Sequence, residues 1–173
     1  MSITAQAVTT TDDAVSITQM TEHDLLEVVE IEESSGLSRW GWAAYYAELQ
    51  GSNRHLMLVA RIKNKPRRGH SVAGYIVARM GADELHINNV AVRDEFRRQG
   101  IGHQLLDRIL EEGRQSQIPC AFLELRGGNT AALALYQKCG FKVTATRKNY
   151  YSDPVEDALV MIIRLGTTLD PLS

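Results

Sequence analysis

Seven short segments of the chain carry the apolar or alternating patterns that predict β-strands. Between two of them lies a basic, turn-rich stretch, residues 63–71, which we expect to form a hairpin loop. The predicted strands are residues 14–20, 55–62, 72–80, 85–92, 118–126, 141–149 and 157–165, with a linker at 150–156 between the last two.

Four other segments have the composition or the apolar spacing of helices. Thr21, Ser38 and Asn129 are expected to cap three of them, because their side-chain oxygens can accept hydrogen bonds from free backbone amides. Gly51 closes the second predicted helix, and Gly140 follows the last one, where a positive φ is favoured. The predicted helices lie within residues 21–35, 36–51, 93–116 and 129–139.

The resulting order of elements is β-α-α-β-β-β-α-β-α-β-β. Three strands joined by short turns, followed by alternating strands and helices, predict an α/β fold with a mixed sheet and helices on both faces. We expect residues 1–13 to be a disordered polar tail, residues 14–166 a single domain and residues 167–173 a loose end.

The composition excludes several classes of protein. Hydrophobic residues make up 44% of the 173 residues and charged residues 23%, which is typical of a soluble domain. The net charge of -2 predicts no attraction to nucleic acid or membranes, and the start lacks a basic and apolar leader pattern. No apolar run approaches the ~20 residues of a membrane span. The two cysteines and five histidines show no metal-site or disulfide spacing, so we expect a cytoplasmic protein without a metal.

The stretch FRRQGIGHQLL follows a predicted strand and opens a predicted helix. The first turn of a helix has backbone amides without partners, and the helix dipole adds positive potential there. Gly100 and Gly102 would let a phosphate approach these amides, and Arg97 and Arg98 would add charge. The stretch matches neither the P-loop nor the GxGxxG motif, in which Leu105 would replace the third glycine. The glycines alone are also compatible with a flexible surface loop.

This stretch and two others resemble a known family. RRQGIG, after a strand that ends in VAV, resembles the acetyl-CoA pyrophosphate loop of the GCN5-related N-acetyltransferases (GNAT). NNVAVRDEFRRQGIG, LELRGGNTAALALYQKCGF and RKNYYSDPVEDALVM resemble the RimI-type enzymes, which acetylate the N-terminal alanine of a small-subunit ribosomal protein. The resemblance implies the GNAT fold, with a mostly antiparallel sheet of about seven strands, and acetyl-CoA as the acetyl donor.

The resemblance also implies roles for individual residues. It places Glu124 at the position of the general base and Tyr136 at that of the general acid, near the coenzyme sulfur. An α-amino group has a pKa near ~8, so a carboxylate suffices as its base. Residues 90–92 match a bulged strand that pairs with the pantetheine amides. The implied coenzyme-binding positions are Val90, Ala91, Val92, Arg97, Arg98, Gln99, Gly100, Ile101, Gly102, His103, Asn129 and Tyr136.

Each of the central residues also has a structural interpretation. Glu124 and Arg126 share one face of a predicted strand and could form a solvated pair there. Tyr136 could be a core aromatic residue, and Asn129 solely a helix cap. His86 is a second candidate for the base, because its ordinary pKa lies near neutrality.

The segment SSGLSRWGWAAYYAEL departs from the resemblance. It occupies the acceptor-gripping region, where RimI-type enzymes more often show Phe-Pro-Trp-Ser, and here the proline is absent. We expect Tyr150 and Tyr151 to cover the acceptor side and to suit a peptide. Three functions stay open: acetylation of the ribosomal alanine, acetylation of another amine (another protein N-terminus, a lysine, a polyamine or an antibiotic), and acetyl-CoA binding without catalysis.

Overall fold

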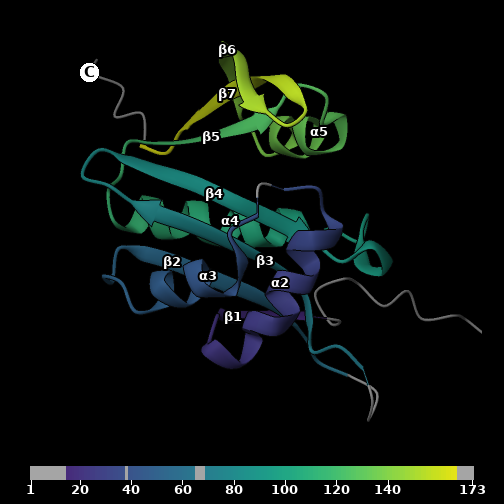
Figure 1. The fold of residues 1–173 in the computed structure, drawn as a ribbon. Helices are drawn as coiled ribbons and strands as arrows, with labels where there is room; N and C mark the ends of the chain where they lie inside the picture. Colours follow the sequence, from purple (N-terminus) through teal and green to yellow (C-terminus); the bar gives the residue numbers. More distant parts are fainter. Residues whose placement is uncertain (1–14, 38, 65–68, 167–173) are drawn as a thin grey trace, which may run out of the picture.

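The computed structural model describes residues 15–37, 39–64 and 69–166 of the chain. The tail expected at 1–13, the loose end expected at 167–173 and the expected helix cap Ser38 lie outside these residues. The elements, labelled in Figure 1, are β1 (Val15–Gln19), η1 (Glu22–Asp24), α2 (Leu25–Ser34), α3 (Gly41–Leu49), β2 (His55–Ile62), β3 (Val72–Met80), β4 (Glu84–Val92), η2 (Asp94–Phe96), α4 (Ile101–Gln115), β5 (Cys120–Arg126), α5 (Thr130–Lys138), β6 (Lys142–Ser152) and β7 (Val155–Arg164).

The described strands form one seven-stranded sheet in the order β1-β2-β3-β4-β5-β7-β6. Neighbouring strands are antiparallel, except that β4 and β5 are parallel. The expected mixed and mostly antiparallel sheet is therefore confirmed. Because β5 follows β4 through the long connection that contains α4, the parallel pair is the one place where the sheet departs from antiparallel pairing.

Helices cover both faces of the sheet, as expected (Figure 1). On one face α4 buries Leu105 and Ile109 in a core shared with β1 to β5. On the other face α2 and α3 bury Leu25 and Tyr45 in a second core. Residues 72–78 of β3 are buried without interruption, because this strand lies between the two cores. A strand covered on both sides reads as a continuous apolar run rather than an alternating one.

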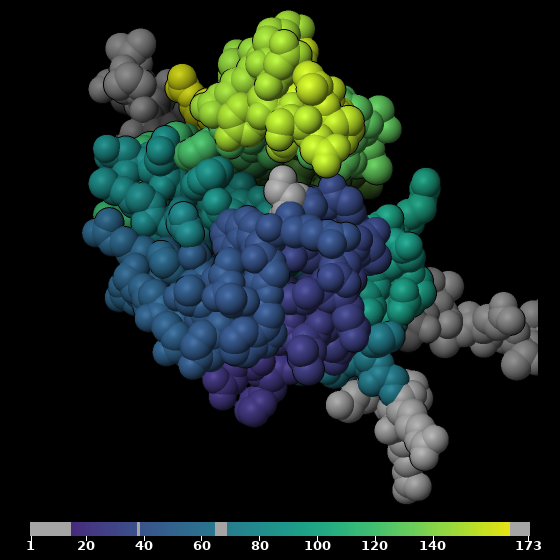
Figure 2. Space-filling view, in the orientation of Figure 1, coloured from purple at the N-terminus to yellow at the C-terminus, as the bar shows by residue number. Residues whose placement is uncertain are grey.

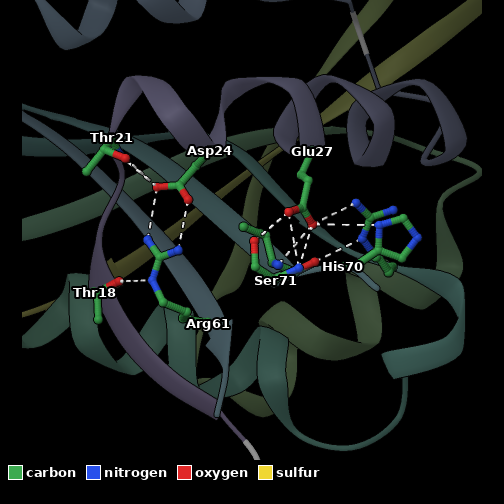
Figure 3. A network of polar contacts seen from close by, with 9 residues as sticks. Thr18, Thr21, Asp24, Glu27, Arg61, His70 and Ser71 are labelled. Atoms are coloured by element: carbon green, nitrogen blue, oxygen red, sulfur yellow. Dashed lines mark hydrogen bonds and ion pairs between the residues drawn. The ribbon is translucent and has the colours of Figure 1, made fainter. Parts of the chain in front are cut away.

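Polar contacts anchor α2 to the strands beneath it (Figure 3). Asp24, just before the helix, forms a two-pronged ion pair with Arg61 of β2, with oxygen–nitrogen distances of 2.9 and 3.0 Å. One turn later, the Glu27 carboxylate accepts hydrogen bonds from the amide of Ser71 at 3.0 Å and from the buried guanidinium of Arg93 at 3.2 Å. These contacts hold the helix that leads into the loop beside the candidate site.

The start of α3 differs from the sequence prediction. The helix begins at Gly41, with Trp40 as its N-cap, rather than near Ser38. The carboxylate of Glu32, in the preceding helix α2, accepts hydrogen bonds from the amides of Trp40 and Gly41 at 2.8 and 3.0 Å. A tertiary contact therefore satisfies the first amides of α3, in place of a local cap.

The linker expected at 150–156 is wrong, because most of it is strand. β6 continues to Ser152, β7 starts at Val155, and these two residues pair directly across the turn. Tyrosines at 150 and 151 favour a strand, whereas Pro154 cannot donate a ladder hydrogen bond and so falls in the turn. The result is a long hairpin that projects beside the open end of β5.

Candidate active site

The parallel strands β4 and β5 are paired over only part of their length. Residues 84–87 of β4 pair with residues 120–123 of β5, and beyond them the strands diverge (Figure 1). The last part of β4 therefore presents a backbone edge that β5 does not cover. Such an edge can receive a strand-like ligand through backbone hydrogen bonds.

A cavity of about 260 Å³ lies where the strands separate, and Glu124, Tyr136, His86 and Asn129 all line it. Figure 2 shows a groove at this level, between the β6–β7 hairpin (yellow-green) and the α2–α3 segment (blue). The structure thus brings the predicted base, the predicted acid, the second candidate base and the predicted pantetheine ligand to one place.

Strand β4 contains the expected bulge at the mouth of this cavity. Val77 of β3 pairs with Asn89, whereas the next residue, Ala78, pairs with Ile87, so that Asn88 is the extra residue. The bulge interrupts the ladder immediately before residues 90–92, the stretch expected to pair with pantetheine. Val90 lines the cavity.

The glycine turn forms the N-terminus of α4. Gly100 is the N-cap with a φ of 81°, a left-handed conformation that glycine adopts without strain. The first amide that donates along the helix is that of Gln104, which bonds to the Gly100 carbonyl at 3.0 Å. The amides of Ile101, Gly102 and His103 precede it and have no acceptor within the helix. The turn has the free amides that the sequence predicted.

Gly102 has a packing role that the sequence did not reveal. It is buried, and a Cβ atom there would lie 3.1 Å from the Leu135 Cδ2 atom of α5. This is closer than ordinary van der Waals contact, so the missing side chain lets α4 and α5 approach each other. Gly102 therefore sets the position of the helix end as well as the access to its amides.

The polar side chains of the turn are engaged in different ways. Arg97 donates to the Val92 carbonyl at 3.0 Å and pairs with Asp94 at 3.0 Å, so it braces the turn. His103 pairs with Asp107 at 2.8 Å along α4. Arg98 is exposed with a φ of 59°, and no side-chain partner is present for it in the described part of the chain. Arg98 is thus the arginine of the pair that is available to a bound anion.

Glu124 is paired with a residue that sequence spacing did not indicate. Its side chain is 16% exposed, and its Oε1 atom lies 2.5 Å from a guanidinium nitrogen of Arg147 on β6. The expected alternative, a pair with Arg126, is not formed, because Arg126 instead contacts Glu156 at 3.3 Å and lies over the ring of Tyr151. The carboxylate therefore lines the cavity from β5 while it is paired with Arg147 of β6.

Tyr136 is both a core residue and a residue of the cavity. It is 8% exposed, its ring meets that of Phe141 edge to face with centroids 5.8 Å apart, and it also lines the cavity. Burial raises the pKa of the Tyr136 phenol above its ordinary value. The hydroxyl is therefore protonated at neutral pH, as a proton donor must be.

His86 lies against Phe122, with stacked rings whose centroids are 4.3 Å apart. Burial lowers the pKa of His86, and the nearby charge of Glu124 opposes this effect. The neutral imidazole is thus the dominant form at neutral pH, and the ring stands beside the Glu124 carboxylate. Its Nδ1 atom is 3.4 Å from the Asn88 side-chain nitrogen.

Further residues shape the cavity, and of these the sequence did not indicate Asn88 or Arg147. Leu37 and Trp40, from the loop before α3, line it together with the expected Tyr150 and Tyr151. Asn88 also lines it, and its Oδ1 atom is buried with no hydrogen-bond partner in the described chain. Arg147 reaches Glu124 from β6. The signal in the sequence for Leu37 and Trp40 was the density of aromatic residues around position 40.

Comparisons with known proteins agree with this geometry. The acetyltransferase (GNAT) family model matches residues 25–141. An N-alpha-acetyltransferase, RimI, from Mycobacterium tuberculosis is 30% identical over 155 residues, which cover 86% of this chain and 92% of that protein. The crystal structure of the ribosomal-protein-S18-alanine N-acetyltransferase from Escherichia coli is similar with a TM-score of 0.76 and 26% identity, over 92% of this chain and 99% of that chain.

A more distant structure shares the fold alone. Arabidopsis thaliana NAA60, in complex with acetyl-CoA, is 16% identical with a TM-score of 0.77, over 87% of this chain and 98% of that chain. The family model and the relative of 30% identity, which agree with this geometry, define the class of protein as an acyltransferase. The chain belongs to the acetyltransferase (GNAT) family.

No described helix combines the length and the apolar character that crossing a membrane requires. No group of three or more histidine, cysteine or acidic side chains is placed to hold a metal ion within the described chain.

Proposed function

We propose that this protein transfers the acetyl group of acetyl-CoA to the N-terminal alanine of a small-subunit ribosomal protein, in the cytoplasm, with Glu124 as general base and Tyr136 as general acid. The observation that carries the proposal is that these two side chains line one cavity at the separation of β4 and β5. The similar Escherichia coli structure, which is named for the same reaction, supports the choice of acceptor.

The donor site would extend from the glycine turn to the cavity. The diphosphate would bind the free amides of Ile101, Gly102 and His103, where the α4 dipole favours negative charge. The pantetheine arm would follow the uncovered edge of β4. The Asn129 Oδ1 atom caps α5 by accepting from the Ala132 amide at 3.1 Å, which leaves the side-chain NH₂ group as a donor to the same arm.

The acetyl group would then meet the acceptor amine inside the cavity. Glu124 takes the proton of the amine as the nitrogen forms its bond to the acetyl carbon. Tyr136 gives its proton to the sulfur as the carbon–sulfur bond breaks, so that the thiol leaves uncharged. Burial raises the pKa of Tyr136, so its hydroxyl is still protonated when this step begins. Arg147 holds the carboxylate in place throughout.

The acceptor side is built for an extended polypeptide. Leu37 and Trp40 form one wall of the cavity, and Tyr150 and Tyr151 form the opposite one. Aromatic walls with polar tips suit a peptide backbone and a small side chain such as that of alanine.

The proposal is tested by thiol release from acetyl-CoA. We expect release with a short peptide that begins Ala-Arg, none with the same peptide carrying an N-formyl group, and little with spermidine. Equal release with the free and the formylated peptide would refute N-terminal transfer. Release with spermidine alone would indicate acetylation of another amine.

A further inference from the structure

Glu32 is a buried acid to which the proposed reaction assigns no role. Its side chain belongs to α2 and is 1% exposed. Neutral groups donate its hydrogen bonds: the amides of Trp40 and Gly41 at 2.8 and 3.0 Å, and the Tyr45 hydroxyl at 2.7 Å. A carboxylate in such a place is costly without these donors, and the dipole of α3 adds to them.

The network continues from Glu32 across the core to β4. The Tyr45 oxygen also contacts the Tyr75 hydroxyl at 2.8 Å and accepts from the Asn89 side-chain nitrogen at 2.9 Å. Because a carboxylate only accepts, Tyr45 must give its own proton to Glu32, and Tyr75 must therefore donate to Tyr45. The donated hydrogen bonds therefore run in one direction and end on Glu32. The four side chains of this run, those of Glu32, Tyr45, Tyr75 and Asn89, are all buried.

Both ends of this network reach residues that line the cavity. At one end, Trp40 and the preceding Leu37 line the wall assigned to the acceptor. At the other end, Asn89 lies between the bulge residue Asn88 and Val90 on β4, the strand whose uncovered edge is assigned to the donor. A continuous run of hydrogen bonds through Glu32 and Tyr45 thus connects the loop before α3 with β4.

We propose that Glu32 is a positioning residue of the acceptor site. It holds the loop before α3 at the position relative to β4 at which the acceptor amine meets the acetyl group. This inference rests on the proposed function. Glu32 touches neither substrate, and it acts through the backbone of Trp40 and Gly41. Its loss should therefore weaken the acceptor site and leave the donor site, at α4 and the free edge of β4, intact.

The first test is the Glu32→Gln variant, in steady-state kinetics with the peptide that begins Ala-Arg. Glutamine keeps the shape but turns an NH₂ group toward one of the donors, so one charged hydrogen bond is lost. We expect the KM for the peptide to rise about tenfold, and the KM for acetyl-CoA to stay within about twofold. Glu33→Gln, at the neighbouring exposed position, is the matched control and should behave as the parent. An unchanged peptide KM, or an equal rise in both KM values, would overturn the proposal.

A second variant covers the case in which Glu32→Gln does not fold. Tyr45→Phe removes one hydroxyl and cuts the network between Glu32 and Asn89, but it leaves the two amide contacts of Glu32 in place. We expect the peptide KM to rise here too, with the KM for acetyl-CoA again unchanged. A parent-like peptide KM in Tyr45→Phe would refute the link between the loop before α3 and β4.

A third measurement does not depend on transfer activity. In a Trp42→Phe background, Trp40 is the remaining tryptophan, and acrylamide quenching reports how firmly it is held. Glu32→Gln should increase its quenching, whereas Glu33→Gln should not. If no peptide is acetylated but this difference is found, the proposed function fails while the positioning role of Glu32 stands. Equal quenching in both variants overturns the positioning role in either case.

Discussion

A valine at position 102 should disturb the N-terminus of α4, and a valine at position 113 provides its control. Both glycines are buried on the same helix. A Cβ atom at 102 would lie 3.1 Å from Leu135, and one at 113 would lie 2.8 Å from Leu165 and 3.1 Å from Leu85. The first clash is beside the free amides, whereas the second is eleven residues, or about 16 Å, further along the helix.

The cost to stability should be similar for the two variants. Overpacking a filled core costs about 1 to 3 kcal/mol. For a domain of this size each kcal/mol lowers Tm by about 2 to 4 °C. Replacing a helical glycine gives the same propensity gain at both sites, so this gain cancels in the comparison. The two variants should therefore melt a few degrees below the parent and close to each other.

The affinity for acetyl-CoA should separate them. Gly102→Val pushes α4 away from α5 and shifts the amides that would bind the diphosphate, so Kd should rise at least about tenfold, or about 1.4 kcal/mol. Gly113→Val should leave Kd within about twofold, because the clash is remote from the turn. Isothermal calorimetry measures both constants and circular dichroism both melting curves. An equal loss of affinity in both variants would refute the assignment of the α4 amides.

Three other substitutions test separate parts of the account. Glu124→Gln should lower turnover by about 10² to 10⁴, and the loss should be largest at low pH, where the amine is protonated. Its affinity for acetyl-CoA should be retained. A full rate at every pH would instead make His86 the base. Tyr136→Phe should slow transfer by about 10² with little change in Tm, and a parent-like rate would exclude it as the acid. Burial raises the pKa of Asp24, but the hydrogen bonds from Arg61 and Thr21 and the charge of Arg61 together outweigh this effect and lower the pKa below 3.8. The pair thus stabilises the fold above that value and is lost as pH falls through the folded pKa. Asp24→Asn should lower Tm at pH 7 and flatten the acid end of the Tm–pH curve, and a curve parallel to that of the parent would contradict this.

Local sequence patterns were sufficient to predict most of the elements. The helical face that includes Leu105 and Ile109 predicted α4, and the largely apolar run at 72–78 predicted β3. These patterns depend on which side of one element meets a core, so a single stretch of sequence contains the information. The glycine turn was predictable for the same reason, because the capping of a helix is local.

The details that the sequence could not predict depend on contacts between distant elements. The start of α3 is determined by Glu32 from another helix, so the local residue Ser38 was a misleading signal. The pair of Glu124 with Arg147 depends on the register of β6 against β7, which shifts twice along the hairpin. No spacing in the sequence records such shifts. The divergence of β4 and β5, which opens the cavity, is likewise a property of the assembled sheet.

The most direct test of the proposed function is mass spectrometry of the small-subunit ribosomal proteins from cells that lack this chain and from cells that overproduce it. The account predicts one ribosomal protein whose N-terminal alanine is free in the first cells and acetylated in the second. An alanine terminus whose acetylation is the same in both would contradict it.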